Sequence, residues 1–194
     1  MMAKFNRESW LQSAVKEVSL LFRSVGYSVP KVQISVGFTG SGKHTNSIGE
    51  CWPTVLALDN VNHIFITPTL DEPVQILKVI VHELVHAIDD CNHKHGQEFK
   101  LIATKIGLEG PMRATTAGAT LSIELHRVAK LLGKFPHKKL KLREKRLFMR
   151  KRPSAECPKC EYRVPMLKLY LQFGAPLCPI HKVQMKQVGD WSWK

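Results

Sequence analysis

The 194-residue chain has no apolar run close to the ~20 residues that a membrane-spanning helix needs. Its first residues include Lys4, Arg7 and Glu8, and no continuous apolar stretch follows them, so we expect no secretory signal. The chain also shows no internal repeat and no low-complexity tract. These absences predict an intracellular globular protein that does not bind a membrane.

Cysteine is scarce, and its count of five is odd. Cys51 and Cys91 stand alone, whereas Cys157, Cys160 and Cys178 lie in a pattern typical of metal sites. This distribution argues against a framework of disulfides and indicates a reducing compartment. We therefore expect the protein in the cytoplasm, nucleoid or nucleus, and not among secreted proteins.

Acidic residues are also few, and the two signs of charge are unevenly placed. Residues 1–110 hold 10 Lys and Arg against 11 Asp and Glu, whereas residues 111–194 hold 19 against 5. The net charge of +13 therefore belongs to the second part of the chain.

The most informative pattern is His-Glu-Leu-Val-His at residues 82–86, inside an apolar run without Pro or Gly. On a helix, His82 and His86 share one face, and two imidazoles at that spacing can bind one zinc ion. Glu83 beside them is placed to take a proton from a water molecule that the metal activates. A purely structural buried helix is the alternative, but burying these three polar side chains without a partner is costly.

A catalytic zinc usually has a third protein ligand. The metzincin pattern fails, because its third histidine would fall at Asn92. In thermolysin-like sites the third ligand is a glutamate on a following helix. Glu109 is distant enough for that role, but it lies at an expected helix end. The residues leave four candidates, which are His93, His95, Glu98 and Glu109.

The segment HELVHA followed by His95-Gly-Gln-Glu-Phe99 resembles the SprT-like (Spartan-type) zinc metalloprotease family. The resemblance covers residues 5–110 and implies that His95 is the third ligand, with His93 in the loop before it. It further implies an endopeptidase that acts on proteins bound or crosslinked to DNA, in DNA repair, with Glu83 as general base.

Hydrophobic periodicity predicts an α+β fold. We expect helices at 10–25, 74–88, 95–106 and 115–132, and strands at 31–37, 48–52 and 63–67. This order suits a small zincin-like core of N-terminal helix, three-stranded sheet, HExxH helix and following helix. The expected domains are the metalloprotease domain (1–112), a helix and basic arm (113–152) and a zinc ribbon (153–194).

The segment from Gly37 to Lys43 matches a phosphate-binding P-loop up to its last position. His44 stands where the motif needs Ser or Thr to reach magnesium, and the residues after it do not predict a helix. The sequence therefore does not predict an ATP site.

Residues 134–152 form a strongly basic stretch, with ten Lys or Arg and one acidic residue among nineteen. Interleaved leucines and Phe148 suggest a partly ordered arm. We expect it to bind DNA through its phosphates; a solvated linker, an anionic membrane or an acidic protein are the alternatives. The candidate contacts are Lys138, Lys139, Lys141, Arg143, Lys145, Arg146, Arg150, Lys151 and Arg152.

A second metal pattern reads Cys157-Pro-Lys-Cys160 and, after seventeen intervening residues, Cys178-Pro-Ile-His181. This spacing is typical of a zinc ribbon, and a Cys3His set is a closed, structural zinc site. A ribbon after the protease domain is also similar to members of the SprT-like family.

Together these patterns predict a monomeric zinc endopeptidase with one catalytic and one structural zinc, targeted to DNA-associated proteins. The alternative is a nucleic-acid-binding zinc protein whose HExxH site is structural or inactive. A weaker third reading is a metal-dependent hydrolase that acts on other substrates.

Overall fold

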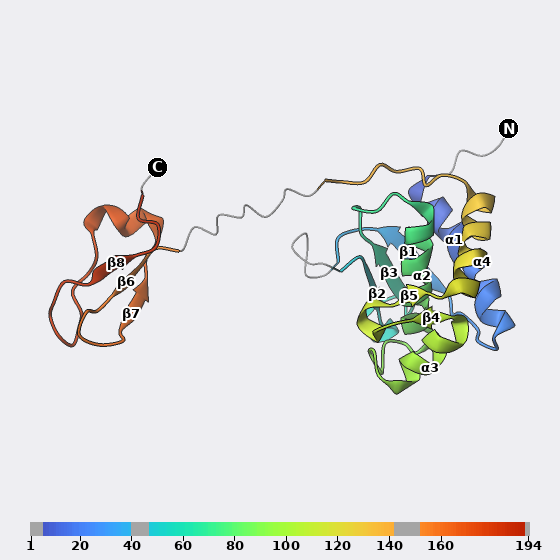
Figure 1. Cartoon of the computed structure of the whole chain (residues 1–194), viewed down its shortest axis with the longest axis horizontal. Helices are drawn as coiled ribbons and strands as arrows, with labels where there is room; N and C mark the ends of the chain where they lie inside the picture. Colours follow the sequence, from blue (N-terminus) through green and yellow to red (C-terminus); the bar gives the residue numbers. More distant parts are fainter. Residues whose placement is uncertain (1–5, 40–46, 142–151, 193–194) are drawn as a thin grey trace. The chain divides into compact units, whose positions relative to one another are not determined.

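The computed structural model describes residues 6–39, 47–141 and 152–192 (Figure 1). The chain divides into two compact units, Met1–Leu142 and Arg143–Lys194. Both contain small sheets, and the first also contains the long helices, so the fold is mixed α+β as the periodicity predicts. Among the described helices, none is long and apolar enough to cross a lipid bilayer.

The first unit follows the predicted order of elements, with bounds that differ by a few residues. Its helices are α1 (Arg7–Ser24), α2 (Pro73–Ile88), α3 (Gln97–Ile106) and α4 (Ala119–Leu132), with short 3-10 helices η2 (Thr54–Leu56) and η3 (Met112–Ala114). Its strands are β1 (Val32–Val36), β2 (Gly49–Trp52), β3 (Asn62–Ile66), β4 (Leu108–Glu109) and β5 (Thr116–Ala117). The sequence did not predict the β4–β5 pair, because two-residue strands are too short to show an alternation.

The three-stranded sheet has the order β1-β3-β2, with β3 parallel to β1 and antiparallel to β2. Alternate side chains face the core, among them Ile34, Ile64 and Ile66, which are all buried. On β2, Gly49 pairs with Ile66 and Cys51 pairs with Ile64. Gly49 and Cys51 therefore belong to the same, helix-facing side of the sheet. The edge strand β2 thus presents these two residues to α2.

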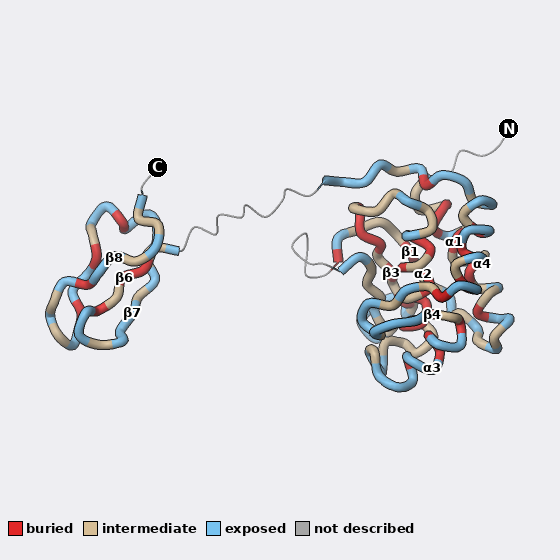
Figure 2. Tube along the Cα trace, viewed as in Figure 1, coloured by how far each residue is buried: buried red, intermediate tan, exposed pale blue. Residues whose placement is uncertain are grey.

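Helix α2 lies at the centre of the first unit and contacts β2, β3, α1, α3 and α4. It begins at Pro73, directly after Glu72. The carboxylate of Glu72 caps the helix by accepting hydrogen bonds from the backbone N–H groups of Val74 and Gln75. Because α2 is surrounded by other elements, buried residues occur around most of the helix, as the red tube of Figure 2 shows. Helix α1 begins with a capping box between Asn6 and Ser9 and packs the fully buried Trp10 into the same core.

The loop between α2 and α3 is held to the sheet by one carboxylate. Asp90 accepts hydrogen bonds from the backbone N–H of Thr54 (2.8 Å), the hydroxyl of Thr54 (2.7 Å) and the side-chain amide of Asn62 (2.7 Å). Asp90, Cys91 and Lys94 all have positive φ angles in this loop, a conformation that such residues seldom adopt. The tie to η2 and β3 explains how the loop keeps this conformation, which sets the direction of the chain toward His95.

Helix α4 and the segment after it belong to the first unit. The indole N–H of Trp10 donates to the carbonyl of Gly133 (3.3 Å), and Phe135 packs edge-on against Trp10 with ring centroids 5.1 Å apart. Further on, the backbone N–H of Leu140 donates to the carbonyl of Pro68 (2.8 Å). The domain boundary expected at residue 112 therefore falls inside the first unit, because this buried aromatic pair binds residues 133–140 to α1.

Part of the expected DNA-binding arm is thus an extended segment on the first unit. Lys138, Lys139 and Lys141 are exposed there, and Lys139 also pairs with Asp71 at 3.8 Å. Arg152 is exposed and is the first described residue of the second unit. The remaining candidates, Arg143, Lys145, Arg146, Arg150 and Lys151, lie outside the described residues, as does most of the expected Gly37–His44 loop.

The second unit is an antiparallel sheet of order β7-β6-β8, formed by β6 (Ser154–Glu156), β7 (Arg163–Pro165) and β8 (Lys186–Val188). A 3-10 helix, η4 (Lys168–Phe173), lies between β7 and β8 along the chain. Its buried core consists of Ala155, Cys157, Ala175, Cys178 and Met185. Two of these five residues are cysteines, so the core offers little apolar surface to stabilise a unit of this size.

Replacing Asp90 with Ala should lower the free energy of unfolding of the first unit by about 2–4 kcal/mol, since three hydrogen bonds to a carboxylate are lost. Urea unfolding of the full chain measures the change. Asp59→Ala is the matched control: Asp59 is 46% exposed and pairs with His63, so its loss should cost under about 1 kcal/mol. Equal costs for the two variants would contradict the role given to Asp90.

Candidate metal centres

Three imidazoles meet beside α2, at the border between the hydrophobic core and a cavity. His82 and His86 come from successive turns of α2, and His95 comes from the end of the loop before α3. The Nε2 atom of His95 lies 3.3 Å from the Nε2 atoms of both other histidines. One ligand nitrogen from each residue falls within 4.8 Å of the others, so the three form a group able to hold a metal ion.

The spacing of these nitrogens fits zinc. Two nitrogens bound at about 2.0–2.1 Å to one tetrahedral zinc lie about 3.3 Å apart, which is the separation observed for two of the three pairs. A hydrogen bond between two neutral imidazoles requires one N–H donor and one acceptor. His95 Nε2 cannot serve both partners in the same way, so a shared ion explains the arrangement better.

Other residues hold the imidazoles in place. Nδ1 of His82 lies 2.8 Å from the hydroxyl oxygen of Thr115, which fixes the ring and leaves Nε2 free to bind a metal. The ring of Phe99 packs under all three histidines, with centroids 5.0 Å from His82, 4.5 Å from His86 and 5.0 Å from His95. The sequence singled out Phe99 as the end of the His95–Phe99 motif, and it gave no signal for Thr115, which lies 33 residues from its partner.

The other candidates for a third ligand lie elsewhere. His93 turns away and places its Nδ1 2.7 Å from a carboxylate oxygen of Asp89. That contact raises the pKa of His93. Among the described residues, neither Glu98 nor Glu109 belongs to a metal-binding group. His95 is therefore the residue that the structure brings to His82 and His86.

Glu83 lies beside this group and is 95% buried, with only 5% of its surface exposed. Its carboxylate reaches the Cα of Gly49 on β2 so closely that a Cβ there would lie 2.5 Å from Oε1. Burial, followed by the charges of Cys91 and Glu50, raises the pKa of Glu83 to about 8 in the metal-free chain. A nearby dication would lower this pKa again, because it stabilises the carboxylate.

The histidines show the opposite effect. Burial and the charge of His95 lower the pKa of His82 to about 4, and burial and the neighbouring histidines lower the pKa of His86 to about 3. Burial and the charge of Arg113 also lower the pKa of His95. All three rings are therefore neutral at pH 7, and their nitrogens can bind a metal without first losing a proton.

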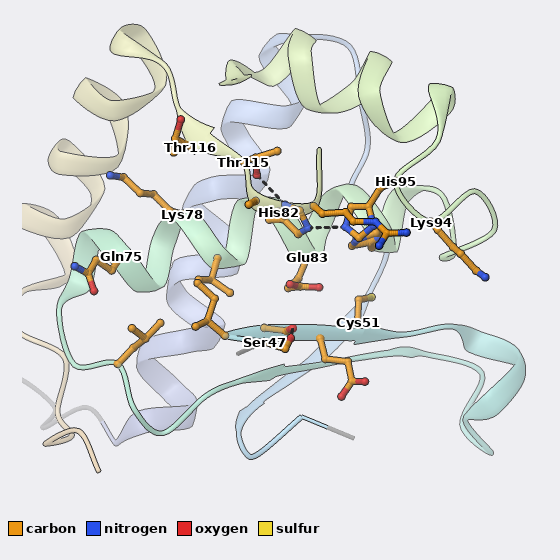
Figure 3. Close-up of a pocket in the computed structure, with 18 of the residues that line it drawn as sticks. Ser47, Cys51, Gln75, Lys78, His82, Glu83, Lys94, His95, Thr115 and Thr116 are labelled. Carbon is orange, nitrogen blue, oxygen red and sulfur yellow. Dashed lines mark hydrogen bonds between the residues drawn. The ribbon is translucent and has the colours of Figure 1, made fainter. Parts of the chain in front are cut away.

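The group opens into a cavity of about 560 Å³ between α2 and the edge strand β2 (Figure 3). Residues 47–51 form one wall, α2 forms another, and residues 113–116 close a third side. Lys78, Lys94 and Arg113 add positive charge around it. An extended edge strand, three imidazole nitrogens and one carboxylate therefore surround one cavity.

The second group lies in the second unit and consists of Cys157, Cys160, Cys178 and His181. Nδ1 of His181 lies 3.7 Å from the sulfur of Cys157 and 3.8 Å from that of Cys178, and the sulfurs of Cys160 and Cys178 are 4.0 Å apart. A tetrahedral zinc with Zn–S bonds of about 2.3 Å sets such pairs about 3.6–3.8 Å apart. These four residues would fill all four positions of such an ion.

Backbone N–H groups support the sulfurs of this second group. The N–H of Lys159 donates to the sulfur of Cys157 (3.4 Å), and the N–H of His181 donates to that of Cys178 (3.5 Å). The latter bond is the largest of the effects that lower the pKa of Cys178 to about 6. Such bonds favour the thiolate, which is the form that binds zinc.

Comparisons with models of protein families, with curated proteins and with solved structures find no match for this chain.

Replacing Gly49 with Ala should lower the free energy of unfolding by about 1–3 kcal/mol. The added Cβ would lie 2.4 Å from Cγ1 of Val79 as well as against the Glu83 carboxylate, so β2 and α2 must separate. Urea unfolding of Gly49→Ala, Val79→Ala and the double variant measures the clash. The double variant should be more stable than the sum of the two single effects predicts, by about 1 kcal/mol. If the two single changes in the free energy of unfolding simply add up in the double variant, β2 shifts away from α2 without strain.

Replacing Cys178 with Ser should reduce the zinc content of the full chain from two ions to one and unfold only the second unit. The reason is that this unit has a small core, so a metal ion bound by its four candidate ligands would supply much of its stability. Native mass spectrometry counts the ions, and limited proteolysis should then cut within residues 152–192 while residues 6–39 and 47–141 resist. Retention of both ions would refute the ligand assignment.

Proposed function

We propose that the chain is a zinc-dependent endopeptidase. One observation carries this proposal: three neutral imidazoles meet beside the buried Glu83 in an open cavity. The Nε2 atom of His95 lies 3.3 Å from the Nε2 atoms of both His82 and His86. Three protein ligands leave one position of a tetrahedral ion for water or substrate, which distinguishes a catalytic from a structural site. The four-ligand group of the second unit lacks that open position.

The surrounding fold supports a zincin-like core. An HExxH helix packs along a small sheet, and the strand nearest to it, β2, is an antiparallel edge strand that borders the cavity. An edge strand has unpaired backbone groups that can hydrogen bond to an extended peptide. Together with the HELVHA and His95–Phe99 motifs, this arrangement supports assignment to the SprT-like family.

Zinc bound to His82, His86 and His95 would polarise the scissile carbonyl and acidify the attacking water. Glu83 accepts the proton of that water and later donates it to the leaving amine. Gly49 sets the distance between Glu83 and β2, because it has no side chain to hold them apart. Thr115 keeps Nε2 of His82 directed at the metal position. The cationic side chains around the cavity are suited to stabilise the negative charge that develops on the carbonyl oxygen.

We further propose that the substrates are proteins associated with, or crosslinked to, DNA. Lys138, Lys141 and Arg152 are exposed, and the chain carries 19 basic residues beyond position 110. Such charge binds phosphates without reading sequence. Binding to DNA would raise the local concentration of DNA-bound proteins at the protease site, so that location contributes to substrate selection.

A second candidate function is nucleic-acid binding without catalysis. The second unit exposes Tyr162, Tyr170 and Phe173 together with Lys168, and aromatic rings among basic side chains can stack on bases. In this case the HExxH site would be structural or inactive, and the biological activity would survive loss of Glu83.

Cleavage of a histone by the zinc-loaded full chain, with and without DNA, separates the two candidates. We expect cleavage that DNA accelerates, and a loss of at least about 100-fold in Glu83→Gln, because the general base is removed. The variant should keep both zinc ions, since Glu83 is not a ligand. Glu98→Gln is the matched control, because Glu98 is exposed on α3 and should cleave like the wild type.

Absence of cleavage, with two zinc ions bound and with tight DNA binding that salt weakens, would favour the second candidate instead. Equal cleavage by wild type and Glu83→Gln would refute the endopeptidase mechanism directly.

A further inference from the structure

The two cysteines that neither metal group uses meet beside the cavity. Cys51 lies on the helix-facing side of β2, and Cys91 lies in the loop just after α2, forty residues later. The sulfur of Cys91 is 3.4 Å from the backbone carbonyl oxygen of Cys51, and both residues line the cavity. In Figure 3, Cys51 points from β2 toward α2, near Glu83.

The backbone around this pair is fixed on both sides. Cys51 is held in β2 by its pairing with Ile64. The backbone N–H of Cys91 donates to the carbonyl of His86 at 2.8 Å, and the neighbouring Asp90 binds Thr54. Because both backbones are anchored, the sulfur of Cys91 is held beside Cys51, and little conformational entropy remains to be lost when the two thiols join.

Neither thiol has another evident role. Both are free thiols and only partly buried, so a small oxidant can reach them through the cavity. Among the described residues, neither belongs to a group able to hold a metal ion. Nor does either cysteine fill the core, since each lies at its margin.

We propose that Cys51 and Cys91 form a reversible disulfide under peroxide stress. A peroxide oxidises one thiol to a sulfenic acid and releases one molecule of water. The sulfur of the second cysteine then attacks the sulfenic sulfur, the S–S bond forms as the S–O bond breaks, and the hydroxyl leaves as water with the second thiol's proton. The two thiols lose two electrons in all, and a dithiol reductant returns them.

The bond would link the wall of the cavity to the loop that carries His95. It closes a loop of forty residues, which reduces the freedom of the unfolded chain and raises the unfolding temperature of the first unit, by on the order of 10 °C. It would also restrain the loop that carries His95. Oxidation should therefore slow the loss of zinc from the first unit to a chelator. Bond formation itself does not depend on the proposed protease activity.

The test treats the zinc-loaded full chain with hydrogen peroxide, blocks remaining thiols with an alkylating agent and maps the peptides by mass spectrometry. We expect a linked peptide that joins Cys51 to Cys91 and disappears after treatment with dithiothreitol. Zinc should protect Cys157, Cys160 and Cys178, because their sulfurs are engaged as ligands. Calorimetry on the same samples should show the higher unfolding temperature of the oxidised first unit.

Two variants make the result specific. Cys51→Ser and Cys91→Ser should each lose both the linked peptide and the rise in unfolding temperature caused by peroxide, when oxidised and reduced samples of the same variant are compared. The proposal is overturned if peroxide converts these thiols to sulfinic acids without linking them, or if they pair only with cysteines of the second unit. A rise in unfolding temperature that persists in both variants would also overturn it.

Discussion

The main constraint on the first unit is that three imidazoles and a carboxyl group lie against its packed hydrophobic core. Removing these groups from water is unfavourable, and the perturbed pKa values of Glu83 and the histidines reflect that penalty. The surrounding structure supplies the compensation. Helix α2 contributes an almost continuously buried surface, Phe99 packs beneath the rings, and Asp90 fixes the loop that brings His95. These contacts bring the three imidazole nitrogens close together.

Much of this arrangement could be predicted from the sequence, because it is encoded locally. Helical periodicity located the helices, alternation located the strands of the main sheet, and the HExxH spacing placed His82, Glu83 and His86 together. The ribbon spacing likewise identified its four ligands as one group. His82 and His86 lie about one helix turn apart, and each half of the second group, Cys157 with Cys160 and Cys178 with His181, spans four residues, so chain geometry leaves few alternatives within each pair.

The rest depends on contacts between distant segments, which periodicity does not reveal. The choice of His95 over His93 follows from a loop with three left-handed residues, and the motif resemblance favoured it where spacing alone did not. Thr115 reaches His82 through the β4–β5 turn, and Gly49 approaches Glu83 across the sheet. The place of α4 and residues 133–140 in the first unit was missed for the same reason, because Phe135 finds its partner in α1.

The tie between Asp90 and its partners on η2 and β3 has a consequence for how the protein matures. His95 can join the other histidines only after the sheet has formed, so a metal ion that binds all three would enter the first unit after it has folded. The second unit would have the reverse dependence, because its small core contains two cysteines of its own candidate metal group. During zinc starvation, newly made chains would therefore contain a folded, metal-free first unit attached to an unfolded second unit. Such chains would be open to degradation from that end.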